Sequence, residues 1–100
     1  MAAYFIFQGV IKDAEKLNNE YSPKVFQTLA PYAAELLVAE ENPEVIEGQV
    51  DLPRTVVLKF KSRDEAKAWY NSPDYQAIVG LRLEAAPGTA ILVDEFAPPS

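Results

Sequence analysis

The order of predicted elements repeats after fifty residues, and this repeat constrains the fold more than any other feature. In each half an apolar or alternating run predicts a strand, a helical segment with an internal Ser-Pro pair follows, and a second strand ends the unit. The strands are predicted at 4–11, 35–40, 55–61 and 89–96. Few residues are identical between the halves. Two such units predict an α+β, ferredoxin-like βαββαβ sandwich, with helices on one face of an antiparallel sheet.

The first helical segment is predicted to begin at Asp13, a capping residue, and to run to about residue 34. Pro23 lies inside it and removes a backbone hydrogen bond. Ser22 is a suitable cap for a restarted helix with Pro23 in its first turn. We therefore predict a kink or break at 21–23.

The second helical segment is predicted as two helices. Ser62 caps the first, over 62–71, and Glu65 completes a capping box. Ser72-Pro73 then begins the next helix. Tyr75, Ile78, Val79 and Arg82 share one face of that helix.

Strand 4–11 has apolar residues on both faces, which predicts a cover on each side of the sheet. The helices supply one cover, so the other face is free for a second subunit. We predict one domain over residues 1–97, a flexible C-terminal tail over 98–100, and a homodimer. A chain of 100 residues buries only about two-thirds of its unfolded surface, which makes added core from a partner valuable.

The composition excludes several classes of function. The chain has no cysteine and no histidine, which excludes disulfides, thiolate or imidazole metal sites and a histidine base. We predict no metal and no cofactor. The net charge is −6 and the basic residues are scattered, which argues against nucleic-acid and anionic membrane partners. The apolar N-terminus is short and lacks a basic region, so we predict a strand there and a cytoplasmic protein.

The segment 47–83 resembles a small bacterial family catalogued as domain of unknown function 1330. The shared pattern is a Glu-Gly pair, a loop ending in Arg, a strand, the run EA-x-A-W-Y-x-S-P-x-Y-Q and a later Arg. The matching residues here are Glu47, Gly48, Arg54, Glu65, Ala66, Ala68, Trp69, Tyr70, Ser72, Pro73, Tyr75, Gln76 and Arg82. Trp69 to Gln76 is the specific part, and weaker resemblance covers roughly the whole domain.

Two positions depart from the family pattern. Lys59-Phe60 stands where the family often has Glu-Phe, which removes a carboxylate near the presumed site. The segment after the first helix lacks the family's frequent Gly pair, which changes how that helix ends.

The resemblance implies ferredoxin-like subunits that dimerise sheet to sheet into an α/β barrel. That superfamily includes cofactor-free monooxygenases, muconolactone isomerases, haem-dependent chlorite dismutases and ligand-sensing domains. The fold therefore does not select a chemistry.

The aromatic residues Trp69, Tyr70 and Tyr75 have two interpretations. They either line a small-molecule pocket between helices and sheet, or they form core packed against the sheet. The two tyrosines also carry hydroxyl groups that need partners if buried.

Three charged residues are further candidates. Arg82 follows apolar residues on its helix face, so it is either an anion clamp for a carboxylate ligand or part of a salt bridge, for example with Glu47. Arg54 ends a loop and is either a ligand contact or a surface residue. Residues 42–50 are a hairpin return or an extension of strand 35–40, and an inward-facing Glu47 is a candidate general base.

Three hypotheses for the function follow. The chain binds a small, aromatic or carboxylic molecule through Trp69, Tyr70, Tyr75, Arg82 and Arg54. Alternatively it is a cofactor-independent isomerase or monooxygenase that uses Glu47 or a tyrosine for proton transfer. In the third hypothesis it is a structural protein whose pocket is filled by its own side chains.

Overall fold

The computed structural model describes residues 1–99 and contains four strands and a series of short helices. In chain order they are β1 (Ala3–Gly9), α1 (Ala14–Lys16), a π-helical turn (Leu17–Tyr21), α2 (Ser22–Leu29), a 3₁₀ turn (Ala30–Tyr32), β2 (Glu35–Glu40), β3 (Arg54–Phe60), α3 (Arg63–Tyr70), α4 (Pro73–Gln76), α5 (Val79–Ala85) and β4 (Gly88–Asp94). The predicted strands are confirmed with small shifts at their ends. No helix in the described part of the chain combines the length and apolar content needed to cross a membrane.

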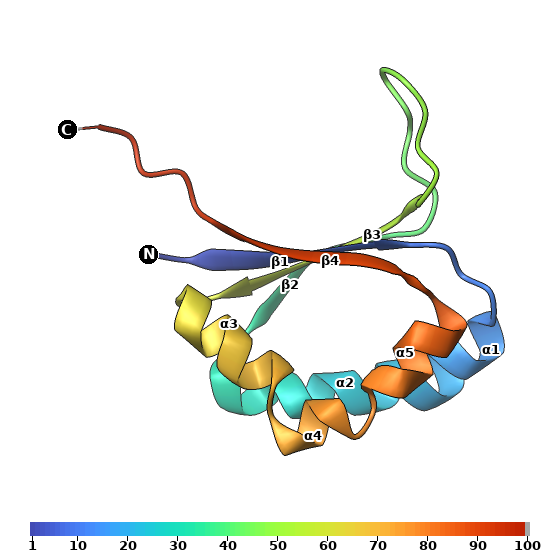
Figure 1. The fold of residues 1–100 in the computed structure, drawn as a ribbon, viewed down its shortest axis with the longest axis horizontal. Coiled ribbons are helices and arrows are strands. Elements are labelled where there is room, and N and C mark those ends of the chain that lie inside the picture. The colour runs from blue at the N-terminus through green and yellow to red at the C-terminus, as the bar shows by residue number, and fades with distance from the viewer. Residues whose placement is uncertain (100) are drawn as a thin grey trace.

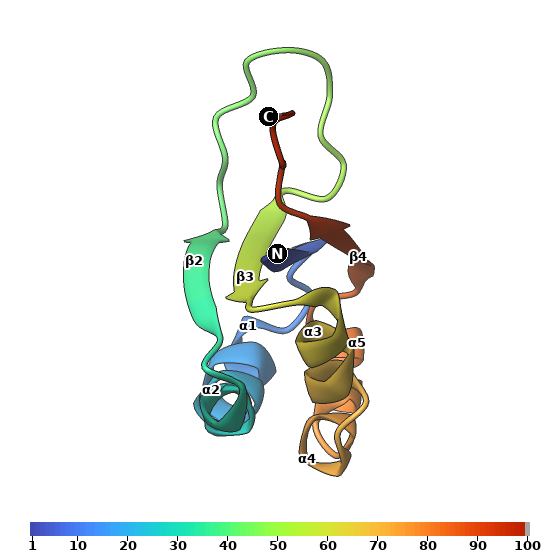
Figure 2. The same cartoon turned by 90° about the vertical axis from the view of Figure 1, so that its left-hand side faces the viewer.

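The four strands form one antiparallel sheet in the order β2-β3-β1-β4. All helices lie on one side of it (Figure 1), and the view along the sheet shows α2 beside the pair α3–α5 in a second layer (Figure 2). This confirms the predicted four-stranded sheet with helices on one face.

Alternate residues of the strands face the helices and form the core. On β1 these are Phe5 and Phe7, and Leu58 of β3 and Leu92 of β4 lie opposite Phe5. The other side, which we call the open face, has no helix over it. Its apolar residues are Tyr4, Ile6, Val38, Val57, Ile91 and Val93.

The predicted break at 21–23 is present as a wide turn and not as a restart. The backbone of Tyr21 and Ser22 stays helical, and the Ser22 N–H donates to the carbonyl of Leu17, five residues earlier. Pro23 has no N–H and crowds the preceding turn, and widening that turn accommodates it. The prediction that Ser22 caps a new helix is therefore wrong.

The second Ser-Pro pair behaves as predicted. Ser72 has extended backbone, its Oγ accepts a hydrogen bond from the Tyr75 N–H at 3.2 Å, and Pro73 is the first helical residue. Ser62 caps α3 in the same way through the Glu65 N–H at 3.1 Å. The predicted single helix after Ser72 is divided into α4 and α5.

Residues 41–53 form a long loop between β2 and β3, so the predicted hairpin return or strand extension over 42–50 is wrong. The paired ladder ends at Glu40, Pro43 and Pro53 have no N–H to donate, and Gly48 has a positive φ of 78°. The loop and the segment after β4 both run away from the helices, on the side of the open face (Figure 1). Pro98 and Pro99 have no regular structure, and Ser100 of the predicted tail lies outside the described residues.

Candidate functional site

A cavity of about 110 Å³ lies between α2 and the helix-covered face of the sheet. Its wall is mostly hydrocarbon, with two guanidinium groups and two hydroxyl-bearing side chains. The lining residues are Phe7, Tyr21, Ser22, Val25, Phe26, Leu29, Leu36, Ala39, Arg54, Val56, Leu58 and Arg82. The helix layer therefore does not fill its own space, and room remains for a small molecule.

Arg82 reaches the cavity from α5 and is only 5% exposed. Its Nε donates to the hydroxyl of Tyr75 at 3.2 Å, and its Cζ lies 4.9 Å from the centroid of the Phe7 ring. Within residues 1–99 no carboxylate lies within 4.0 Å of it, since the ion pairs are Lys16–Glu84 and Arg63–Asp94. A buried guanidinium without a counter-charge is costly, so the cavity holds an unbalanced positive charge.

Tyr21 stands beside Arg82 because the π-helical turn ends on it. Its hydroxyl lies 2.9 Å from that of Tyr75, and both tyrosines are buried. Burial raises the pKa of Tyr21 well above its usual range, and the neighbouring Tyr75 raises it further. Tyr21 therefore keeps its proton at neutral pH and acts as a hydrogen-bonding group, not as a base.

Arg54 is the first residue of β3 and supplies the second positive charge. It is half-buried, and burial lowers the pKa of its guanidinium, as does the nearby charge of Arg82. It also borders a neighbouring hollow lined by Glu40 and Glu41. Arg54 thus lies between the cavity and an acidic rim.

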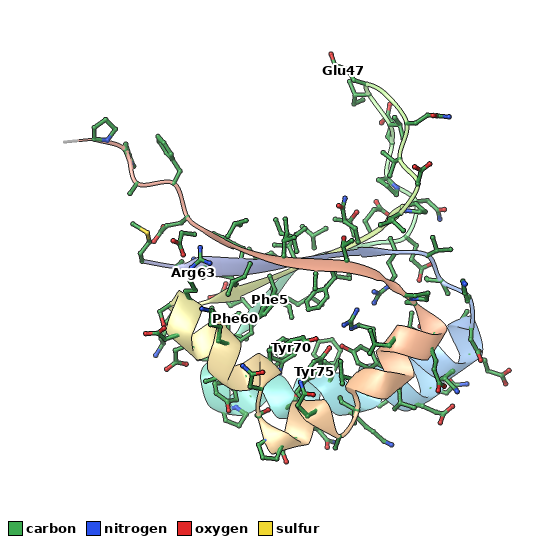
Figure 3. All side chains as sticks on the ribbon, in the orientation of Figure 1. Phe5, Glu47, Phe60, Arg63, Tyr70 and Tyr75 are labelled. Atoms are coloured by element: carbon green, nitrogen blue, oxygen red, sulfur yellow. The ribbon has the colours of Figure 1, made fainter. Side chains whose placement is uncertain are left out.

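The aromatic residues Trp69, Tyr70 and Tyr75 do not line this cavity, contrary to the pocket interpretation. Trp69 and Tyr75 are fully buried, their ring centroids lie 4.1 Å apart, and the Trp69 Nε1 donates to the Thr28 hydroxyl at 2.9 Å. Figure 3 shows Tyr70 and Tyr75 pointing from the helices toward Phe5 on the sheet. They form core because their flat rings fill the space between the layers. Tyr75 reaches the site only through its hydroxyl.

Glu47 lies far from this site. It is exposed at the far end of the loop 41–53, on the opposite side of the sheet from the helices (Figure 3). The prediction that it lies mid-strand is wrong, because the strand ladder ends before residue 42. A salt bridge between Glu47 and Arg82, one of the alternatives for Arg82, is absent among residues 1–99.

Sequence reasoning identified Arg82 and Arg54 but missed Tyr21 as part of the site. Tyr21 falls on the apolar stripe of its helix, so the sequence pattern indicates a core residue and gives no sign that it lines a cavity. The available signal was Pro23 two positions later, since a widened turn next to a functional residue is common.

Comparisons with solved structures support the fold. A protein of unknown function from Rhodopseudomonas palustris aligns with a TM-score of 0.78 at 12% identity, over 97% of this chain and 84% of that chain. Its methylated form gives a TM-score of 0.71 at 10% identity, over 99% and 84%. A dabb family protein with a ferredoxin-like fold from Mesorhizobium loti gives 0.50 at 15% identity, over 99% and 97%.

No curated protein sequence matches this chain. The family described as "Domain of unknown function (DUF1330)" matches residues 2–96, which is nearly the whole sequence. The ferredoxin-like architecture, the tryptophan-tyrosine corner of α3 and α4 and this match agree: the chain belongs to the DUF1330 family.

Proposed function

We propose that this protein binds a small, negatively charged organic molecule in the cavity between α2 and the sheet, and that it does so as a homodimer. The observation that carries the binding proposal is the guanidinium of Arg82, buried beside Arg54 with no carboxylate partner within residues 1–99. An anionic ligand supplies the missing counter-charge, and charge-assisted hydrogen bonds are strong in such surroundings.

The enzyme alternative has less support. Glu47 lies outside the cavity, and burial raises the pKa of Tyr21, which opposes its use as a general base. Among residues 1–99 no acidic side chain lines the cavity wall. The hypothesis of a self-filled pocket also has less support, because the aromatic core leaves the cavity open.

Arg82→Met tests the binding proposal. Methionine is unbranched, shorter and uncharged. The unliganded variant should be about as stable as the parent, because loss of the bond to Tyr75 is offset by removal of a buried charge that has no counter-charge. Organic acids should raise the melting temperature of the parent and leave that of Arg82→Met unchanged. Arg63→Met is the matched control, because Arg63 is exposed and pairs with Asp94 at the surface.

An equal response of the parent and Arg82→Met to every acid would refute the proposed site. Native mass spectrometry of the protein from its own host gives an independent reading. A small acid should accompany the parent and be absent from Arg82→Met.

The open face of the sheet supports the homodimer. It presents a row of apolar side chains, among them Ile91, which is 52% exposed. A sheet face of this kind normally packs against a second layer. The loop 41–53 and the segment after β4 extend past this face and carry the exposed side chains of Ile46 and Phe96 (Figure 1). A second copy that packs sheet to sheet covers both.

Sedimentation equilibrium tests the dimer. Ile91→Glu should shift the mass from twice 11.1 kDa toward 11.1 kDa, because it places a charge in the interface. Leu83→Glu is the matched control, since Leu83 is also 52% exposed but belongs to α5 in the helix layer. A parent protein that is monomeric at micromolar concentration contradicts the proposal.

A further inference from the structure

A hydrogen-bond direction along Arg82, Tyr75 and Tyr21 follows from which groups hold a proton and which need an acceptor. The Arg82 Nε–H donates to the Tyr75 oxygen, because a guanidinium has no acceptor. Tyr75 is fully buried, and within residues 1–99 the other partner of its hydroxyl is the hydroxyl of Tyr21 at 2.9 Å, where either oxygen can donate. A buried O–H is costly without an acceptor, so the arrangement that satisfies Tyr75 is donation to the Tyr21 oxygen. The Tyr21 proton has no acceptor within residues 1–99, and Tyr21 lines the cavity.

The two terminal nitrogens of Arg82 are also available to a ligand. They make no hydrogen bond within residues 1–99, whose only bond from this side chain is through Nε. Arg82 is only 5% exposed and lines the cavity, so a ligand in the cavity lies against this side chain.

The polar end of the cavity is therefore rich in donors and positively charged. Tyr21 and Arg82 line it with side chains that carry O–H and N–H donors, and Arg54 adds a second guanidinium. Within residues 1–99 the side-chain oxygens of the wall are the hydroxyl groups of Tyr21 and Ser22, which are neutral. No carboxylate of residues 1–99 lines the wall, so an ammonium group on a ligand finds no counter-charge there.

The rest of the wall is hydrocarbon, with Val25, Leu29, Leu36 and Leu58 among its residues. A volume of about 110 Å³ corresponds to roughly seven to eleven non-hydrogen atoms, if each water-sized position takes about 10–15 Å³. The planar fork of a guanidinium fits a carboxylate with two parallel hydrogen bonds. A phosphate group is bulkier and more strongly hydrated than a carboxylate, so it leaves less room for a hydrocarbon tail and costs more to bring out of water.

We propose that the ligand is a short monocarboxylate with a branched or aromatic hydrocarbon tail and no amino group. Its carboxylate accepts hydrogen bonds from the terminal nitrogens of Arg82 and from the Tyr21 hydroxyl, and its tail lies between α2 and β2. Tyr75 is a positioning residue, since it turns the Tyr21 proton toward the ligand. This inference rests on the proposed binding of an anion in the same cavity.

A ligand panel on the intact protein tests the class. Benzoate and 3-methylbutanoate are the expected binders, with benzamide, leucine, phenyl phosphate and inorganic phosphate as comparisons. Binding is followed by NMR titration of the indole N–H of Trp69, the single tryptophan, which lies next to Tyr75. We expect benzoate to bind at least tenfold more tightly than benzamide or phenyl phosphate, and 3-methylbutanoate at least tenfold more tightly than leucine.

The outcomes separate this inference from the proposed function. If phenyl phosphate binds as tightly as benzoate, or leucine as tightly as 3-methylbutanoate, the monocarboxylate inference is wrong but the proposed anion site is not. If benzamide binds as tightly as benzoate, or if no compound binds, both the monocarboxylate inference and the proposed anion site are wrong.

Tyr21→Phe tests the hydrogen-bond direction with little change in shape. It should weaken benzoate binding about tenfold and leave the weak binding of benzamide unchanged, whereas Arg63→Met should change neither. If Tyr21→Phe binds benzoate as the parent does, the assigned role of the Tyr21 proton is wrong. The panel on the parent protein decides the ligand class even if a variant fails to fold.

Discussion

Ser22-Pro23 and Ser72-Pro73 occupy equivalent places in the two halves of the chain, yet only the second pair begins a new helix. The backbone of Ser72 is extended and its hydroxyl caps α4. The backbone of Ser22 is helical, and the chain passes through it after a widened turn. A Ser-Pro pair favours the start of a helix. In this chain it begins a new helix only where the preceding helix has already ended.

The widened turn before Pro23 and the capped corner at Ser72 each position one tyrosine at the polar end of the cavity. The widened turn ends on Tyr21, and the capped corner buries Tyr75 in the first turn of α4. Their hydroxyl groups meet at 2.9 Å, although the residues are 54 positions apart. The difference between the halves is therefore what produces the polar end of the cavity, since Tyr21 borders open space and Tyr75 is enclosed.

The largest expected effect is from truncating the enclosed tyrosine. Tyr75→Ala should lower the free energy of unfolding by about 3–5 kcal/mol, as loss of a fully buried aromatic ring does. Tyr21→Ala should cost less, because its ring already borders a cavity. Urea unfolding followed by circular dichroism measures both, and equal losses would remove the distinction between an enclosed and an open tyrosine.

Removing only the hydroxyl of Tyr75 should have the next largest effect. Tyr75→Phe leaves the buried Nε–H of Arg82 without its acceptor, which should cost about 1–3 kcal/mol. Tyr21→Phe keeps that bond but leaves the neutral Tyr75 O–H without its acceptor, which should cost less than an unpaired N–H of a charged group. Urea unfolding of the two variants gives the order, and a larger cost for Tyr21→Phe contradicts the greater importance assigned to the Arg82–Tyr75 bond.

High pH should reveal the raised pKa of Tyr21. A tyrosine in the unfolded chain loses its proton near pH 10.0, whereas folded Tyr21 retains it to higher pH. Its contribution to stability is therefore complete below pH 10 and is lost as pH rises above it, by up to about 1.4 kcal/mol per pH unit. The difference in unfolding free energy between the parent and Tyr21→Phe, measured from pH 9 to 11, isolates this group. A difference that stays constant over that range contradicts the raised pKa.

The smallest expected effect separates the two serines. Ser72→Ala removes the acceptor of the Tyr75 N–H and the donor to the Trp69 carbonyl, and should cost about 1 kcal/mol. Ser22→Ala removes no cap and should change the free energy of unfolding by less than about 0.5 kcal/mol. Thermal unfolding of the pair measures this contrast. Equal costs would mean that Ser22 stabilises its helix in a way that the structure does not show.

The fold was predictable from sequence because its signals are local. Alternation in 55–61 and the capping serine Ser62 predict β3 and α3 without reference to other segments. Arg82 was also predictable as a candidate, since a guanidinium on an apolar helix face needs an explanation.

The cavity was not predictable, because it depends on how well two layers fill the space between them. Trp69 and Tyr75 have the composition of a ligand pocket, and only their packing shows that they are core. Glu47 failed for a different reason: its neighbourhood resembles a strand, but Pro43 and the positive φ of Gly48 end the ladder. The widened turn that brings Tyr21 to the site accommodates Pro23. A regular helical period of 3.6 residues does not predict such a turn.

The pairing of β1 with β4 joins segments that lie far apart along the chain. Ala3 lies opposite Asp94, and the backbone N–H of Glu95 donates to the carbonyl of Ala2. Until β4 pairs, one edge of β1 has no neighbouring strand, and Phe5 and Phe7 have an incomplete core. Because closing so long a loop has a large entropic cost, we expect the β1–β4 pairing to limit the folding rate of this domain.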